Sequence, residues 1–148
     1  MSKCRVRQGV IVGVVALVAS IVASVAVVGT GSQRAEAGPE MIGNPSVETV
    51  DPSAGAQPLA WEPDAWGTIT AALTHPTGDA HTGTRYARVA ITARTSGDAK
   101  WRFEPVPVVA STVYTFSDWY RASASTELVV EVTAATGAVS WIWLRSVP

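Results

Sequence analysis

The chain has 148 residues, which suits one domain of ordinary size rather than two. From Gly38 onward, seven Lys and Arg stand against eleven Asp and Glu. This formal charge of −4 argues against a nucleic-acid partner, which requires a basic surface. The single cysteine, Cys4, precedes this part of the chain, so neither a disulfide nor thiol chemistry is expected after Gly38.

Residues 1–37 have the composition of an export segment. Basic residues near the start precede the uncharged residues 8–33, in which Val10–Val28 is almost entirely apolar. This pattern is typical of a signal peptide, expected here as a helix, and Ala35-Glu36-Ala37 fits a small-x-small cleavage site. The apolar run also approaches the ~20 residues that span a bilayer, so a single-pass anchor is the alternative. In both cases residues 38–148 are expected outside the cell, secreted or anchored.

The part of the chain after residue 37 predicts strands. Residues 38–64 are rich in proline, glycine, serine and alanine, which excludes a long helix, and Ser46–Val50 is expected as one short strand. Beyond Trp66, β-branched and aromatic residues alternate in short runs between turn signals, without a helical stripe. The expected strands are residues 68–74, 85–94, 100–104, 113–121, 127–133 and 139–144.

Short strands at this spacing predict an all-β domain over residues 38–148, an antiparallel β-sandwich of jelly-roll type. The six or seven strands expected are fewer than the eight of a jelly roll. The sequence also stops directly after a strongly apolar strand. These two observations predict that the closing strands of the domain are missing, and we expect the domain to be a monomer.

The most informative feature of the domain is its tryptophan content. Six tryptophans lie after residue 60, and indole rings stack on the apolar faces of sugars while charged neighbours hydrogen-bond the hydroxyls. Trp119 and Arg121 share a strand face, and Glu131 is expected to face outward. Replacing Trp119 with Ala is therefore expected to weaken polysaccharide retention, although core packing is the alternative for any single ring. The candidate carbohydrate-binding residues are Trp101, Trp119, Arg121, Glu131, Trp141 and Trp143.

Catalytic and metal sites have less support from the sequence. His75, Asp79 and His81 lie close together, but their spacing matches no zinc pattern. Glu127 and Glu131 lie roughly 13 Å apart along one strand face, too far for a retaining glycosidase pair. The sequence has neither a nucleophile elbow nor a phosphate-binding glycine loop, so we expect a binding domain rather than an enzyme.

Three stretches, Asn44–Glu48, His81–Val89 and Val113–Arg121, carry a family resemblance when taken in order. Together they resemble carbohydrate-binding modules of families 4 and 9, cellulose-binding jelly rolls, especially those attached to actinobacterial polysaccharide deacetylases and glycoside hydrolases. The resemblance implies polysaccharide binding on one sheet face. It also implies a structural calcium, for which Glu48 matches one ligand position. The late acidic ligand of the family would fall beyond Pro148.

Two other interpretations stay open from the sequence. In the first, the domain is a cell-surface structural or adhesion sandwich without sugar affinity. In the second, it is a nonfunctional truncated product. The exposure of the tryptophans distinguishes the first from carbohydrate binding. Two or more indoles exposed on one sheet face favour sugar binding, whereas burial of every ring favours the structural role.

Overall fold

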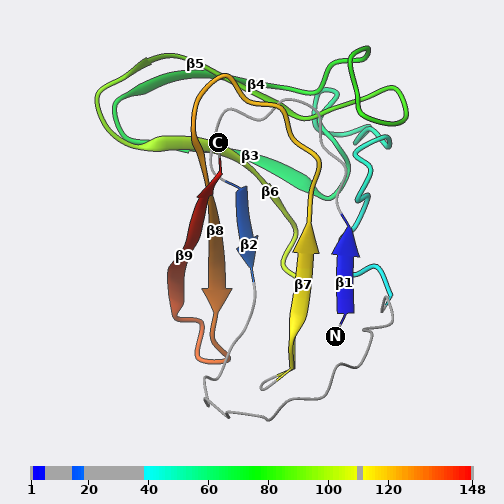
Figure 1. Ribbon diagram of the computed structural model, residues 1–148, viewed down its shortest axis with the longest axis vertical. Helices are drawn as coiled ribbons and strands as arrows, with labels where there is room; N and C mark the ends of the chain where they lie inside the picture. Colours follow the sequence, from blue (N-terminus) through cyan, green and yellow to red (C-terminus); the bar gives the residue numbers. More distant parts are fainter. Residues whose placement is uncertain (1, 6–14, 19–38, 110–111, 148) are drawn as a thin grey trace.

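A computed structural model describes residues 2–5, 15–18, 39–109 and 112–147. The described part consists of strands and loops and contains no helix, so the all-β prediction is confirmed (Figure 1). The strands are β1 (Ser2–Arg5), β2 (Val15–Val18), β3 (Trp61–Trp66), β4 (Ile69–Thr74), β5 (Arg88–Arg94), β6 (Asp98–Phe103), β7 (Tyr114–Ser117), β8 (Thr126–Thr133) and β9 (Val139–Val147).

Six of these strands, β4 to β9, lie at the positions that the alternation predicts, with ends shifted by a few residues. The predicted strand Ser46–Val50 is wrong. Val47 has a positive φ of 53°, which breaks an extended conformation, and Val50 forms only an isolated bridge with Pro58. Conversely, β3 was not predicted, because Pro63 lies at its middle. Its place at the edge of a sheet explains how it tolerates a residue without an N–H group.

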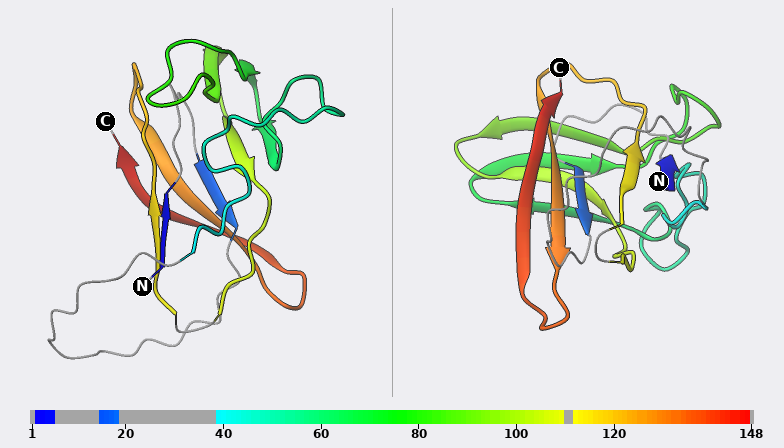
Figure 2. Two further views of the ribbon diagram at one scale, coloured as in Figure 1. Left: turned by 90° about the vertical axis from the view of Figure 1, so that its right-hand side faces the viewer. Right: turned by 60° about the horizontal axis from the view of Figure 1, so that its bottom comes forward.

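The strands form one five-stranded sheet in the order β3-β6-β2-β8-β9 and two two-stranded sheets, β4-β5 and β1-β7. The pairings of β3 with β6, β4 with β5 and β8 with β9 are antiparallel, whereas β1 and β2 join their neighbours in parallel. In the right-hand view of Figure 2, β8 and β9 run steeply across the direction of β3 and β6. The five-stranded sheet is therefore strongly twisted, as its β-branched and aromatic strands allow.

The predicted export helix over residues 1–37 lies outside the described residues, except for β1 and β2, which are strands. Since the described residues form no helix, they include none that is long and apolar enough to cross a bilayer.

The main core lies where the β4-β5 hairpin covers β3 and β6. Trp61, Val89, Trp101 and Phe103 are at most 3% exposed there, and the edge of the Phe103 ring meets Trp61 at 5.4 Å between centroids. The indole N–H of Trp101 donates to the carbonyl of Arg88, which ties β6 to β5 and satisfies the buried polar atom. Partly buried side chains of β4, β5 and β7 complete this cluster: Ile69, Ala71, Leu73, Ile91 and Phe116.

Two glycines allow the turn after β3 to touch the turn before β6. Gly67 and Gly97 have φ values of 88° and 85°, in the left-handed region that glycine adopts without strain. A Cβ atom at Gly67 would lie 2.7 Å from the Cα of Gly97, and one at Gly97 would clash with the carbonyl oxygen of Trp66. Close backbone contact here fixes where β3 ends and β6 begins.

Candidate functional site

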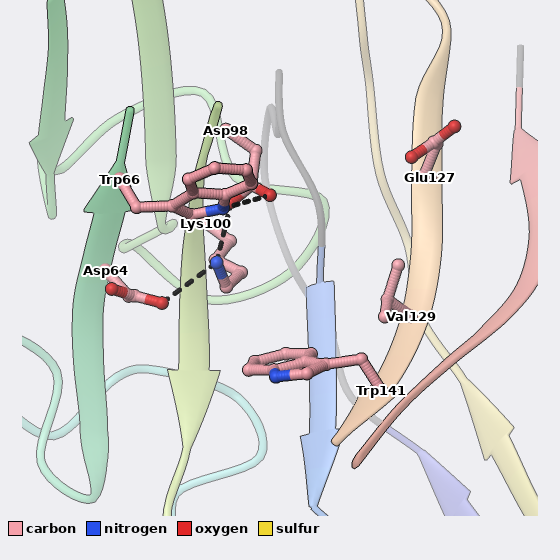
Figure 3. Close-up of a pocket in the computed structure, with 7 residues that line it drawn as sticks. All are labelled: Asp64, Trp66, Asp98, Lys100, Glu127, Val129 and Trp141. Carbon is pink, nitrogen blue, oxygen red and sulfur yellow. Dashed lines mark hydrogen bonds and ion pairs between the residues drawn. The ribbon is translucent and has the colours of Figure 1, made fainter. Parts of the chain in front are cut away.

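A cavity of about 480 Å³ opens over the twisted sheet. One wall belongs to β3 and β6 and the other to β8 and β9, with β2 between them (Figure 3). Figure 3 shows the indoles of Trp66 and Trp141 on two sides of the Lys100 ammonium, with Glu127 and Val129 on the β8 wall. Its lining residues are Asp64, Trp66, Asp98, Lys100, Glu127, Val129 and Trp141.

The register of β3 against β6 assembles the first wall. Asp64 lies opposite Lys100, and Trp66 lies opposite Asp98, so alternation places all four side chains on one face. The ammonium of Lys100 pairs with Asp64 at 2.9 Å and with Asp98 at 2.6 Å, and its side chain is only 3% exposed. The indole N–H of Trp66 donates to the second oxygen of Asp98 at 2.7 Å. These contacts hold the Trp66 ring, itself 60% exposed, at the rim of the cavity.

The second wall follows from the register of β8 against β9. Trp141 lies opposite Glu131 and Trp143 opposite Val129, so both indoles share the face of the sheet that bears the cavity. The ring of Trp141 lies under the Lys100 ammonium, 5.2 Å from nitrogen to ring centroid, a cation–π contact that joins the two walls. Trp141 and Trp143 are 48% and 58% exposed. Their ring surfaces are therefore available to a ligand.

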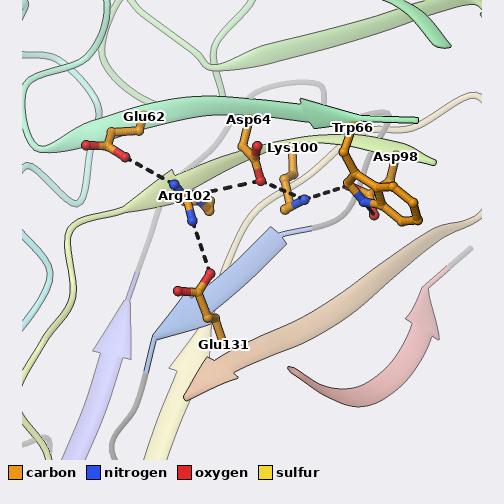
Figure 4. A network of polar contacts seen from close by, with 7 residues as sticks. All are labelled: Glu62, Asp64, Trp66, Asp98, Lys100, Arg102 and Glu131. Carbon is orange, nitrogen blue, oxygen red and sulfur yellow. Dashed lines mark hydrogen bonds and ion pairs between the residues drawn. The ribbon is translucent and has the colours of Figure 1, made fainter. Parts of the chain in front are cut away.

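Arg102 connects the same two walls beside the cavity (Figure 4). Its guanidinium contacts Glu62 of β3 at 3.2 Å and Glu131 of β8 at 3.1 Å, so it bridges β6 and β8 over β2. Its Nε atom is buried, has no hydrogen-bond partner among the described residues and lies 3.9 Å from Asp64. The two terminal nitrogens of Arg102 are thus held by one acid from each wall.

The charge of this face is negative. Glu62, Asp64, Asp98, Glu127 and Glu131 supply five carboxylates, and Lys100 and Arg102 supply two cations, which gives a formal charge of −3. Fields of one sign in a recessed site raise the local concentration of ligands of the opposite sign and repel those of the same sign. The site therefore suits neutral or cationic ligands rather than anionic ones.

Two of the predicted binding residues are corrected by the structure. Trp101 is 1% exposed under the β4-β5 hairpin, where no ligand reaches its ring. Glu131, expected to face outward, is 9% exposed and accepts from Arg102. Alternation along β6 and β8 identifies which residues share a face. It does not show that the β4-β5 hairpin covers Trp101 on β6 or that Arg102 contacts Glu131 on β8.

Trp119 and Arg121 lie together at a second place, outside the residues that line the cavity. The Trp119 ring stacks on His81 at 4.1 Å between centroids with an interplanar angle of 10°, which covers one of its faces. Arg121 forms an ion pair with Asp79, and the hydrogen bond between them raises the pKa of the guanidinium. This pair of contacts fastens the 118–121 segment to the loop of residues 75–85. Trp119 remains 52% exposed.

The implied calcium ligand, Glu48, is surrounded by hydrogen-bond donors. Its carboxylate accepts from the backbone N–H groups of Thr84 and Arg85 and from the Thr84 hydroxyl, each at 2.9 Å. Burial raises the pKa of Glu48, but these bonds and the Arg85 charge together lower it below its ordinary value. Because N–H and O–H donors occupy three of the about four lone-pair sites of this carboxylate, the environment does not fit a calcium ion. Within the described ranges no three His, Cys, Asp or Glu side chains gather as metal ligands would.

Several residues of the cavity were not singled out by sequence reasoning. Trp66 and Asp64 belong to β3, which was not predicted because Pro63 lies within it, and Lys100 was not named as a candidate site residue. The available signal was the spacing of Asp64 and Trp66, two residues apart, which places them on one face of any strand. Their partners on β6 and β9 depend on registers that alternation leaves open.

Comparison of the chain with protein-family models, with curated proteins and with solved structures finds no match.

Proposed function

We propose that this chain is a non-catalytic module that binds polysaccharide in the cavity between Trp66 and Trp141. One observation carries the proposal: two exposed indoles from different strands line one cavity together with three carboxylates. Indole faces stack on the C–H faces of pyranose rings, and carboxylate oxygens accept hydrogen bonds from sugar hydroxyls. The cavity volume also lies within the range of about 300–1,000 Å³ that is usual for small-ligand sites.

The layout favours an extended ligand over a small enclosed one. Trp143 lies two residues beyond Trp141 on the same exposed face of β9. A chain of sugars that stacks on Trp141 can therefore continue along β9 toward Trp143, roughly 7 Å further along the strand. This extended row of rings suits a polysaccharide, and the resemblance to the carbohydrate-binding modules of families 4 and 9 supports the same class of ligand.

The proposal includes the jelly-roll topology and the export of residues 38–148. The layering of the β4-β5 hairpin on β3 and β6 is consistent with part of a sandwich. Export rests on the composition of residues 1–37, and N-terminal sequencing of the protein recovered outside the cell checks the cut after Ala37.

The test compares three tryptophan variants of the full chain by pull-down on a panel of insoluble glycans. We expect Trp66→Ala and Trp141→Ala each to weaken binding about fivefold, because one aromatic stacking contact contributes about 1 kcal/mol. Trp119→Ala is the comparison variant, because Trp119 is an exposed tryptophan outside the cavity lining that the sequence also predicts to bind, and a smaller loss of about twofold is expected.

If the chain binds a glycan and neither Trp66→Ala nor Trp141→Ala weakens this binding, the cavity is not the binding site. A loss confined to Trp119→Ala would move the site to the ring that stacks on His81. Circular dichroism of each variant separates loss of contact from loss of fold.

A second candidate is a surface domain that associates with other proteins without sugar affinity. It is favoured by β9, an edge strand on which Val139, Ile142 and Leu144 are exposed as well as the two tryptophans. Exposed apolar edge strands are sites of strand addition by other chains. Failure to bind any glycan, together with a mass that rises with protein concentration, would favour this role over the first.

A further inference from the structure

The cavity is more acidic than a neutral sugar requires. Three of its seven lining residues are carboxylates, and the one cation among them, Lys100, is 3% exposed and held by two of the three. Asp98 uses both of its oxygens, one for Lys100 and one for the Trp66 indole. These two acids are therefore compensated from within the wall that bears them.

Glu127 is the carboxylate that remains. It stands on the β8 wall, across from Lys100, and its side chain is exposed (Figure 3). Among the described residues it forms no ion pair, and its strand partner on β9 is the uncharged Ser146. An uncompensated acid in the same cavity as two exposed indoles favours a cationic ligand, because the ring faces and the carboxylate all attract positive charge.

We propose that the cavity selects polysaccharides that carry free amino groups, with the ammonium of one amino sugar paired to Glu127 while another sugar of the same chain stacks on Trp141, four residues further along the β8-β9 ladder. This inference rests on the proposed function and adds the class of substrate. The same charge disfavours uronic-acid and sulfated glycans, since a face of formal charge −3 repels them. Lys100 does not offset this, because its ammonium already has two carboxylate partners.

The experiment uses three β-1,4-linked hexamers that differ only in the group at C2: glucosamine, N-acetylglucosamine and glucose. Affinities for the full chain are measured by isothermal titration calorimetry at low salt and about pH 5.5, where carboxylates of ordinary pKa are ionised and the sugar amines are protonated. We expect the glucosamine hexamer to bind about three- to fivefold more tightly than the glucose hexamer, the gain of a partly exposed ion pair. The N-acetylglucosamine hexamer, with no charge, should follow the glucose hexamer.

The variant Glu127→Gln tests the partner of the amine. It keeps the size of the side chain and removes its charge, so the ratio of the two affinities should fall to about one. Glu104→Gln is the matched control, an exposed carboxylate outside the cavity lining, and should keep the ratio of the unaltered chain. In the unaltered chain, the ratio of the glucosamine-hexamer affinity to the glucose-hexamer affinity should also fall toward one at about 1 M salt. The Debye length there is about 3 Å, so salt screens the ion pair.

The outcomes separate this inference from the proposed function. Equal affinities for the glucosamine and glucose hexamers overturn the amine preference and leave polysaccharide binding in place. A preference that Glu127→Gln leaves intact overturns the assignment of Glu127. If none of the three hexamers nor any glycan of the panel binds, the proposed function fails and the substrate class fails with it.

Discussion

The two antiparallel strand pairs on either side of β2 differ in whether a second layer covers their tryptophans. In β3 and β6, Trp61 and Trp101 are at most 3% exposed, under the cover of the β4-β5 hairpin. In β9, Trp141 and Trp143 are about half exposed, and Ile142 and Leu144 on the other face reach solvent as well. Tryptophan is core on the face of β3 and β6 that the hairpin covers, and surface at Trp66 of β3 and on β9. A second layer makes the difference, and strand alternation alone does not predict where that layer lies.

The two strand pairs contribute differently to a binding site. The β3-β6 pair, covered by the hairpin, supplies a rigid wall, and the β8-β9 pair supplies exposed rings. The β3-β6 pair carries the Lys100 and Arg102 ion pairs that fix the cavity walls. The β9 strand contributes rings that no described element covers. A binding site needs both properties, a fixed geometry and an available face.

The most direct way to break the comparison is to truncate one tryptophan from each pair. Trp101→Ala should lower the free energy of unfolding by about 3–5 kcal/mol, because it leaves a large cavity in a closed core. Trp143→Ala should lower it by less than about 0.5 kcal/mol, because an exposed ring loses little on truncation. Urea denaturation of both variants measures the difference. Similar losses in the two variants would mean that β9 is covered in solution.

A second test asks whether the buried lysine holds the covered pair together. Lys100→Met keeps the length of the side chain but leaves Asp64 and Asp98 without their cation. Removing one partner of a buried ion pair costs about 3–5 kcal/mol, and the partial exposure of both acids, near 30%, reduces the expected loss to about 2 kcal/mol. The fluorescence of Trp66, which donates to Asp98, should change in the folded variant. Unaltered stability would show that solvent already screens the two acids.

The smallest effect is expected at Glu48, which fastens the loop of residues 82–85 to the segment before β3. Its pKa is lower in the folded chain than its ordinary value of 4.5, so folding favours the ionised form. The stabilisation is complete above the ordinary value and is lost as pH falls through the lowered one. Glu48→Gln should therefore melt at a lower temperature than the unaltered chain at pH 7, and the gap should close as the pH falls below about 4.

Melting temperatures from about pH 7 down to about pH 3 measure this gap. Asp51, whose pKa is also lowered by hydrogen bonds from Ser53, is present in both chains and cancels in the comparison. A gap that stays constant over the whole range would show that the hydrogen bonds of Glu48 do not depend on its charge.

The alternation of side chains predicted most of the strands, but it did not predict which residues come together in the site. It predicted β4 to β9 because successive side chains of a strand point to opposite faces, so a two-residue period of apolar and polar residues indicates a strand. It missed β3 because a proline within a run speaks against a strand, unless the strand lies at an edge. Without β3, neither the pairing of Asp64 with Lys100 nor the position of Trp66 opposite Asp98 follows.

Some candidate residues could be predicted from local alternation, whereas the environment of others depends on contacts between distant parts of the sequence. Trp141 and Trp143 were predicted as binding residues and are exposed on the cavity face, because both their strand and their alternation were clear. Trp101 has an equally clear pattern and is buried, because the hairpin that covers it comes from elsewhere in the sequence. Lys100 was not predicted as a site residue, because only the long-range register shows its two acidic partners.

The contact between Gly67 and Gly97 bears on any attempt to redesign this molecule for another ligand. The exposed positions of the walls, Trp66, Glu127 and Trp141, face open space, so a library can vary them without moving the backbone. The two turns cannot be diversified in the same way, since a single methyl group at Gly67 would meet backbone atoms closer than 3 Å. A mutational scan would thus divide the site into freely exchangeable positions and two fixed ones, and the fixed ones never touch the ligand.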